Sequence, residues 1–115
     1  MDREDVPAGH GVYALACDNA DASRESLANF LPARAIPLAL ESQRLVYVGE
    51  SRHLQRRVRE HVDGEWGGKF TSAHPPVELL EYESVDSGDE TDEKGFAETF
   101  HDPPQTFVYS DVMEY

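Results

Sequence analysis

Four side chains capable of acid–base or anion-binding chemistry lie in or shortly after apolar stretches: Tyr13, Tyr47, Arg57 and His61. Arg57 and His61 are four residues apart, so a helix would place them one turn apart on the same face. A guanidinium group can clamp an oxyanion through two hydrogen bonds, which a lysine cannot do. A phenol with a pKa near 10 is a poor base at neutral pH unless neighbouring groups assist it. Without a further pattern, the same residues are ordinary core aromatics and solvated surface charges.

Two short apolar runs and one helix would position these groups. Residues 11–17 and 45–49 each form an apolar run next to a glycine, which is typical of buried strands. Ser51 can cap a helix over residues 52–62. The apolar face of that helix would consist of Leu54, Val58 and Val62. The tyrosines are therefore expected on strands, and the arginine and histidine on the helix that follows.

The second half of the chain predicts two more strands and a helix. Residues 77–85 alternate apolar and acidic side chains as a half-exposed strand does, and 106–109 form a short apolar run. A helix is expected over 92–100, ended by the Asp-Pro-Pro sequence that follows. Strands and helices alternate too rarely for a doubly wound sheet. We therefore expect a small α+β domain with a three-stranded, mostly antiparallel sheet flanked by helices.

The composition indicates one domain with a very acidic surface. The chain has 115 residues, a net charge of −13 and 39% hydrophobic residues, which is enough apolar material for a core. We expect residues 1–115 to form a single domain, and the lone cysteine excludes an internal disulfide. Acid-rich, lysine-poor surfaces are typical of proteins in molar salt, although an acidic interaction surface in ordinary salt is an alternative. With no apolar run near the roughly 20 residues of a membrane span and no targeting signal, we expect a cytoplasmic protein without membrane association.

The basic residues are concentrated in one part of the chain. Residues 44–74 hold six bases and four acids, a net charge of +2, whereas the remainder has a net charge of −15. On the expected helix, Arg56, Arg57 and Arg59 cluster beside the apolar face. One face of this acidic protein is thus expected to tolerate an anionic partner.

Several short sequences together resemble the GIY-YIG nuclease family. They are Gly11-Val12-Tyr13, Tyr47-Val48-Gly49 and the helix pattern Leu54-x-x-Arg57-Val58-x-x-His61. Lys69-Phe70-Thr71, followed by Pro76-Val77-Glu78-Leu79, is similar to a further stretch of small, standalone members. The resemblance extends over most of the chain. It implies a metal-dependent phosphodiesterase that acts on DNA.

The resemblance also implies a role for each of the four side chains. Tyr13 would help to activate the attacking water, and Tyr47 would line the same pocket. Arg57 would face the scissile phosphate, and His61 would be a second acid–base group or a pocket-lining residue. A charged donor of this kind offsets the charge that phosphodiester hydrolysis builds on the phosphate.

The implied metal ligand is a glutamate on the helix over 92–100. The choice lies between Glu93 and Glu98, and we prefer Glu98 because the pair has the spacing of the family's Glu-Ala-x-x-x-Glu pattern. Glu98 would hold Mg²⁺ or Mn²⁺ through oxygen. Ser110 follows Tyr109 where repair-type members carry an asparagine. The expected substrate-binding residues are Gly49, Arg56, Lys69 and Ser110.

The main departure from the family lies between the two tyrosines. Members commonly join these strands by a much shorter hairpin, whereas this chain has 33 residues between Tyr13 and Tyr47. We expect residues 19–43 to be an insertion packed beside the sheet. Within it, Asp21 or Ser23 can cap a short helix that Pro32 ends, and Pro37 limits any second helix.

We therefore expect a divalent-metal-dependent DNA endonuclease that acts in DNA repair or processing. A catalytically weak or inactive nucleic-acid-binding module that keeps the fold is the alternative, favoured by Ser110 and the insertion. An acidic protein-interaction domain is a third class. Because the net charge opposes DNA binding, a protein partner that supplies DNA targeting is also expected.

Overall fold

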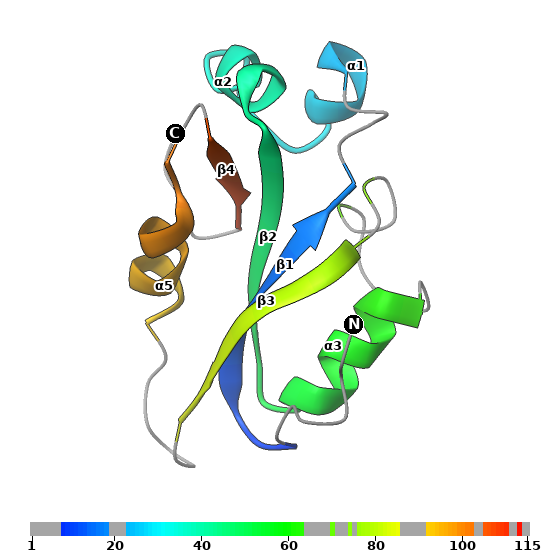
Figure 1. The fold of residues 1–115 in the computed structure, drawn as a ribbon, viewed down its shortest axis with the longest axis vertical. Coiled ribbons are helices and arrows are strands. Elements are labelled where there is room, and N and C mark those ends of the chain that lie inside the picture. The colour runs from blue at the N-terminus through cyan, green and yellow to red at the C-terminus, as the bar shows by residue number, and fades with distance from the viewer. Residues whose placement is uncertain are drawn as a thin grey trace.

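A computed structural model describes residues 8–18, 23–63, 70, 74, 76–85, 92–102, 105–110 and 113, and confirms the α+β fold class (Figure 1). The strands are β1 (Gly11–Cys17), β2 (Arg44–Ser51), β3 (Pro76–Ser84) and β4 (Thr106–Tyr109). The helices are α1 (Arg24–Leu27), α2 (Ile36–Glu41), α3 (Leu54–Asp63) and α5 (Glu93–Phe100). Within the described residues, no helix is long and apolar enough to span a membrane.

The four strands form one mixed sheet in the order β3-β1-β2-β4. β1 pairs antiparallel with both β2 and β3, and Tyr13 lies opposite Gly49 of β2. β4 pairs parallel with β2, with Tyr47 beside Tyr109. The expected count of three strands was therefore wrong by one. Parallel neighbours need a long connection, so the pairing of β4 depends on tertiary packing rather than on a local turn.

One face of the sheet packs against α3, and we call it the α3 face. Tyr13, Leu15 and Cys17 of β1 share a core there with Leu54 and Val58 of α3. Because strand side chains alternate between faces, every second residue of β1 points into this core. All seven residues of β1 are buried, which makes this strand the centre of the domain.

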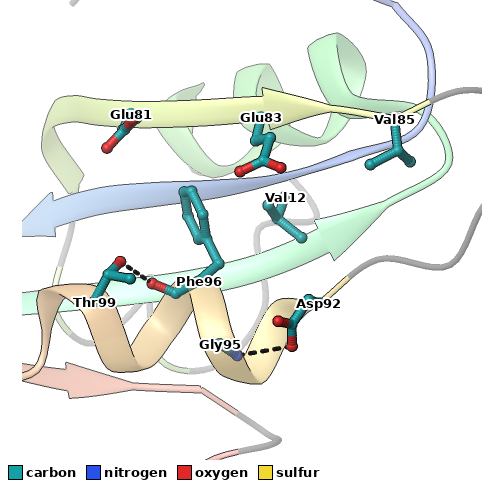
Figure 2. Close-up of a pocket in the computed structure, with 8 residues that line it drawn as sticks. All are labelled: Val12, Glu81, Glu83, Val85, Asp92, Gly95, Phe96 and Thr99. Atoms are coloured by element: carbon teal, nitrogen blue, oxygen red, sulfur yellow. Dashed lines mark hydrogen bonds between the residues drawn. The ribbon is translucent and has the colours of Figure 1, made fainter.

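The opposite face packs against α5, and we call it the α5 face. Ala14, Val46, Val48 and Val108 of the strands share a second, smaller core there with Ala97 of α5. Figure 2 looks onto this side and shows α5 in front of the sheet and α3 behind it. The sheet therefore separates the two longest helices.

The expected insertion forms two short helices at the end of the sheet where β1 ends and β2 begins (Figure 1). Ser23 caps α1, and its hydroxyl and that of Ser26 form a reciprocal capping box. The cap at Ser23 is confirmed, whereas the alternative Asp21 lies outside the described residues. Pro37 lies at the start of α2, where a missing N–H costs nothing, and not at its end. Leu27 is buried in the core of the α3 face and anchors the insertion.

Candidate active site

The phenol of Tyr13 and the imidazole of His61 form a buried hydrogen-bonded pair on the α3 face. The Oη atom of Tyr13 lies 2.8 Å from Nε2 of His61. Each side chain is about 1% exposed, so water does not compete for the contact. β1 supplies the tyrosine, and the last turn of α3 supplies the histidine. The packing of Leu54 and Val58 against β1 fixes α3 at the distance that this hydrogen bond needs.

Tyr47 of β2 lies beside this pair. Its ring centroid is 6.2 Å from that of Tyr13 and 5.1 Å from that of His61. Both tyrosines occupy positions of their strands that point to the α3 face. The two tyrosines of the sequence motif therefore meet one imidazole.

Arg57, one helical turn before His61, adds a positive charge to these groups. Its charge acts on both Tyr13 and His61, and its side chain is 30% exposed, so the guanidinium also reaches solvent. Its Nη1 atom donates to Oε2 of Glu60 over 3.1 Å. The structure thus brings together Tyr13, Tyr47, Arg57 and His61, which we call the motif cluster.

Burial fixes the protonation states of the motif cluster. Burial is the main cause that raises the pKa of Tyr13; the nearby Tyr47 adds to the rise, and Arg57 opposes it. Burial, assisted by the Arg57 charge, lowers the pKa of His61 to about 4. At neutral pH the cluster therefore holds a phenol and a neutral imidazole. With its proton on Nδ1, that imidazole accepts a hydrogen bond from the Tyr13 hydroxyl at Nε2.

The two motif glycines allow this close packing. A Cβ atom on Gly49 would lie 2.5 Å from Oη of Tyr13, so the phenol occupies the space above the β2 backbone that a side chain would fill. A Cβ atom on Gly11 would lie 2.5 Å from the carbonyl oxygen of Glu83 and 2.9 Å from Cδ2 of Leu54. Gly49 was expected to bind substrate; its observed contact is with the catalytic tyrosine candidate.

The other expected substrate-binding residues have different surroundings. Arg56 is exposed on α3, and its Nε atom forms an ion pair with Oε1 of Glu60 at 3.4 Å. Ser110 is buried after β4 and donates a hydrogen bond to Oε1 of Glu93 over 3.3 Å. Lys69 lies outside the described residues. Of the two described residues, Arg56 is the one that shares a carboxylate, that of Glu60, with the arginine of the motif cluster.

Glu98, the preferred metal ligand, does not join the motif cluster. It is exposed on α5, which covers the opposite face of the sheet. Its alternative, Glu93, contacts Ser110. No group of three or more His, Cys, Asp or Glu side chains that could hold a metal ion is found in the part of the chain that the structure describes. The Glu60 carboxylate reaches the motif cluster, and both its oxygens contact arginines.

Aromatic rings that sequence reasoning did not assign to the site extend the motif cluster. Tyr47 stacks against Phe70 and Tyr109, with ring centroids 5.9 Å and 6.0 Å away. Phe70 and Tyr109 stack on each other at 4.3 Å, and Phe30 of the insertion contacts both edge-on. A signal existed for Phe70, which lies between lysine and threonine in the family-like stretch, and for Tyr109, on the last strand. Phe30 had none.

The α5 face carries a cavity of a different character. It has a volume of about 480 Å³ and lies between α5 and β3 (Figure 2). The carboxylates of Glu81, Glu83 and Asp92 line it, together with the ring of Phe96. An acidic lining of this kind repels phosphate. This cavity and the motif cluster lie on opposite sides of the sheet.

The fold and the motif cluster together define a class: a small α+β domain with a tyrosine–arginine–histidine site on one face of its sheet. The chain belongs to the GIY-YIG catalytic domain family, whose model matches residues 35–98. The matched region begins at residue 35, just before α2, so β1 and its Tyr13 lie outside it. The structure nevertheless places Tyr13 in contact with matched residues, because β1 pairs with β2 along its whole length.

Two curated relatives share part of the sequence. A UPF0213 protein of Syntrophus aciditrophicus is 37% identical over 46 residues, which cover 40% of this chain and 53% of the relative. A UPF0213 protein of Haloquadratum walsbyi is 41% identical over 46 residues, covering 40% of this chain and 51% of the relative. The matched segment thus spans about half the length of these relatives. No solved structure matches the chain.

Proposed function

We propose that this protein is a divalent-metal-dependent endonuclease that hydrolyses phosphodiester bonds of DNA, in DNA repair or processing. The observation that carries the proposal is the 2.8 Å contact between Tyr13 and His61 beside the Arg57 guanidinium, on a domain of a nuclease family. These groups supply a proton path and an anion clamp, which phosphodiester hydrolysis requires.

Arg57 would bind the scissile phosphate through its solvent-exposed guanidinium. A phosphate there offsets the positive charge that helps to lower the pKa of His61. The pKa of His61 therefore rises when substrate binds, and Nε2 becomes a better proton acceptor. This coupling makes proton transfer depend on the presence of the substrate.

The attacking water would lose its proton along the Tyr13–His61 pair. As the water oxygen bonds to phosphorus, its proton passes to Oη of Tyr13 while the phenol proton passes to Nε2 of His61. The phosphorus–oxygen bond to the leaving group breaks, and the leaving alkoxide takes a proton from solvent, while the proton gained by His61 returns through Tyr13 to solvent. The raised pKa of Tyr13 supports this relay, because a phenol that stays protonated can accept one proton only while it donates another.

The described residues do not fit a metal ion at the motif cluster. Glu98 is on α5, and the oxygens of Glu60 are already held by Arg56 and Arg57. The proton relay therefore involves only residues of this chain, and the Mg²⁺ or Mn²⁺ requirement is a separate part of the proposal. Cleavage that continues at full rate in EDTA would remove that part and leave the rest.

A nicking assay on supercoiled plasmid tests the function. Incubation in molar KCl with Mg²⁺ or Mn²⁺ should convert the plasmid to the nicked form. Arg57→Ala and Tyr13→Phe should each lower the rate by about 10² to 10³-fold, the cost of removing one transition-state contact. Arg59→Ala is the matched control, since Arg59 is an exposed arginine of the same helix and should keep the wild-type rate. Equal rates in all four proteins would contradict the site assignment.

A nucleic-acid-binding module without catalysis is the second candidate. The position of Glu98 on the α5 face favours it, because the family's metal ligand would then be missing from the site. This candidate predicts that the wild-type chain binds DNA but nicks no plasmid with either metal. Binding that depends on Arg57, without cleavage, would establish it.

The targeting partner and the cytoplasmic location also belong to the proposal. The net charge of −13 supports a partner, because phosphate contacts from this chain alone are few. Co-purification from cells, followed by a nicking assay with and without the captured protein, tests the partner directly.

A further inference from the structure

A continuous row of aromatic rings leads away from the motif cluster. Tyr47 stacks on Phe70 and Tyr109 with interplanar angles of 22° and 25°, and Phe70 and Tyr109 are nearly parallel at 8°. Phe30 closes the row with its ring edge-on to Phe70, at 5.2 Å and 80°. We call Phe30, Tyr47, Phe70 and Tyr109 the aromatic wall.

The aromatic wall forms the edge of the core of the α3 face, where three of its four rings are partly exposed. Phe70 is 3% exposed, whereas Phe30, Tyr47 and Tyr109 are only partly buried and cover it. Tyr47 belongs to both the wall and the motif cluster, so the wall begins where the phosphate would bind. Phe30 lies before residue 35 and Tyr109 after residue 98, so half of the wall lies outside the family match.

The charge distribution requires such a surface if this chain binds nucleic acid. The motif cluster offers Arg57, with Arg56 beside it, and Glu60 offsets part of their charge. The remainder of the protein is strongly acidic, so contacts with phosphates further along a strand are unfavourable. Affinity must then come from contacts that do not depend on charge. Stacking of a base on an aromatic ring is such a contact, and it tolerates any base.

We propose that the aromatic wall binds an unpaired nucleobase next to the scissile phosphate, so that the substrate is a single strand or an unpaired segment. This inference rests on the proposed function, because it takes the phosphate to lie at Arg57. A base inside a duplex has both faces covered by its neighbours and cannot reach the wall without unstacking, which is energetically costly. The wall thus selects the form of the nucleic acid and not its sequence.

A binding experiment without divalent metal separates this inference from catalysis. The full chain is titrated in molar KCl and EDTA against three fluorescent probes of equal length, and anisotropy is measured. The probes are a mixed-sequence single strand, the same backbone made entirely of abasic sites, and a blunt duplex. We expect the single strand to bind about tenfold more tightly than the abasic strand, and the duplex to bind more weakly than the single strand.

Matched variants locate the contact. Phe30→Leu and Tyr109→Leu keep apolar volume but remove the ring, and each should weaken single-strand binding by about five- to tenfold while leaving abasic binding unchanged. Phe100→Leu is the control, because Phe100 is a partly buried ring on the α5 face. A variant that loses abasic binding to the same extent as single-strand binding has a folding defect. The affinities of the wild-type chain for the three probes then decide whether the wall binds a base.

The outcomes distinguish this inference from the proposed function. Equal affinity for the natural and abasic strands, or tighter binding to the duplex, overturns the inference while plasmid nicking can still support the nuclease. Absence of both nicking and binding to any probe overturns the proposed function and the inference together. A base-dependent affinity that Phe30→Leu and Tyr109→Leu reduce, and Phe100→Leu does not, supports the inference.

Discussion

The two faces of the sheet differ in chemistry although the same strands build both. The α3 face gathers a phenol, an imidazole, a guanidinium and a row of aromatic rings. The core of the α5 face consists mainly of small aliphatic side chains, and carboxylates line the cavity beside it. The sheet therefore separates the motif cluster from the carboxylates that line the cavity of the α5 face.

This difference shows how strongly the site depends on strand parity. Tyr13, Tyr47 and Gly49 all occupy positions that point to the α3 face, and the register pairs Tyr13 with Gly49. A slip of one residue in either strand would turn its contribution to the α5 face. The spacing of the motif within each strand is thus a structural requirement of the cluster.

In the substrate-free protein, we expect the largest effect on the α3 face from low pH, which should lower the stability of the fold. Burial lowers the pKa of His61 to about 4, so between pH 6.5 and 4 the unfolded chain binds a proton that the folded chain does not. The contribution of His61 to the free energy of unfolding is complete above about pH 6.5. It falls by about 3 kcal/mol as the pH decreases through this window. Urea unfolding at a series of pH values measures it.

His61→Phe is the control for this prediction. The variant keeps a ring of similar size but has no proton to bind, so its stability should depend less on pH over the same window. The difference between the two profiles isolates His61 from the other titrating groups, including His101, whose pKa is also lowered by burial. Parallel profiles would show that His61 is not buried as a neutral group.

Gly49→Ala should damage the α3 face at a single point. The added Cβ atom would lie 2.5 Å from Oη of Tyr13, so the phenol must move away from His61. We expect a loss of about 1–3 kcal/mol, as for other overpacked sites, together with reduced nicking. Gly9→Ala is the matched control, because no atom lies within 4 Å of a Cβ at Gly9. Thermal unfolding of both variants tests this prediction. An unchanged Tm for Gly49→Ala would contradict it.

Asp92→Ala should weaken the α5 face without touching the motif cluster. The Asp92 carboxylate caps α5 by accepting a hydrogen bond from the Gly95 amide over 3.0 Å. Removing this cap should cost about 1 kcal/mol of stability and leave the nicking rate of the folded protein unchanged. Asp92→Asn keeps an acceptor and should retain most of the stability. A parallel loss of activity would mean that α5 contributes to catalysis.

Glu98→Gln should have the smallest effect on stability and nicking rate. It is also the variant that best distinguishes the roles of the two faces of the sheet. The side chain is exposed on the α5 face, where neutralising one carboxylate changes stability by less than about 0.5 kcal/mol. From this position we expect the nicking rate and its dependence on Mg²⁺ concentration to match the wild type. A large loss that added Mn²⁺ partly restores would identify Glu98 as the metal ligand, as the family resemblance implies, and would show that both faces serve the reaction.

Local patterns in the sequence were sufficient for most of the helices and strands, whereas the candidate site was implied by the family resemblance. The strands expected at 11–17 and 106–109 have those bounds in the structure, and the helix expected over 52–62 begins at Leu54. Alternation and helical spacing are local properties, and together they determine which side chains share a face. These patterns placed Arg57 and His61 on one face of a helix, whereas their convergence on Tyr13 was implied by the family resemblance.

The remaining features depend on contacts between distant segments. Glu98 could be placed on a helix, but the face that α5 covers is decided by its packing against Val46 and Val108. The contact of Phe30 with Tyr109 joins the insertion to the last strand, and neither segment carries a local signal for the other. The strand at 106–109 was expected, but its parallel pairing with β2 as a fourth strand of the sheet escaped prediction for the same reason.

The position of β4 in the chain also controls when the aromatic wall can form. Although β4 pairs with β2, it is made only after α3, β3 and α5, so Tyr109 is the last ring to arrive. During synthesis, a chain that has not yet passed this strand has Tyr47 and Phe30 but lacks the ring that both contact. We therefore expect a ribosome-bound nascent chain that ends before this strand to bind unpaired bases more weakly than the finished chain.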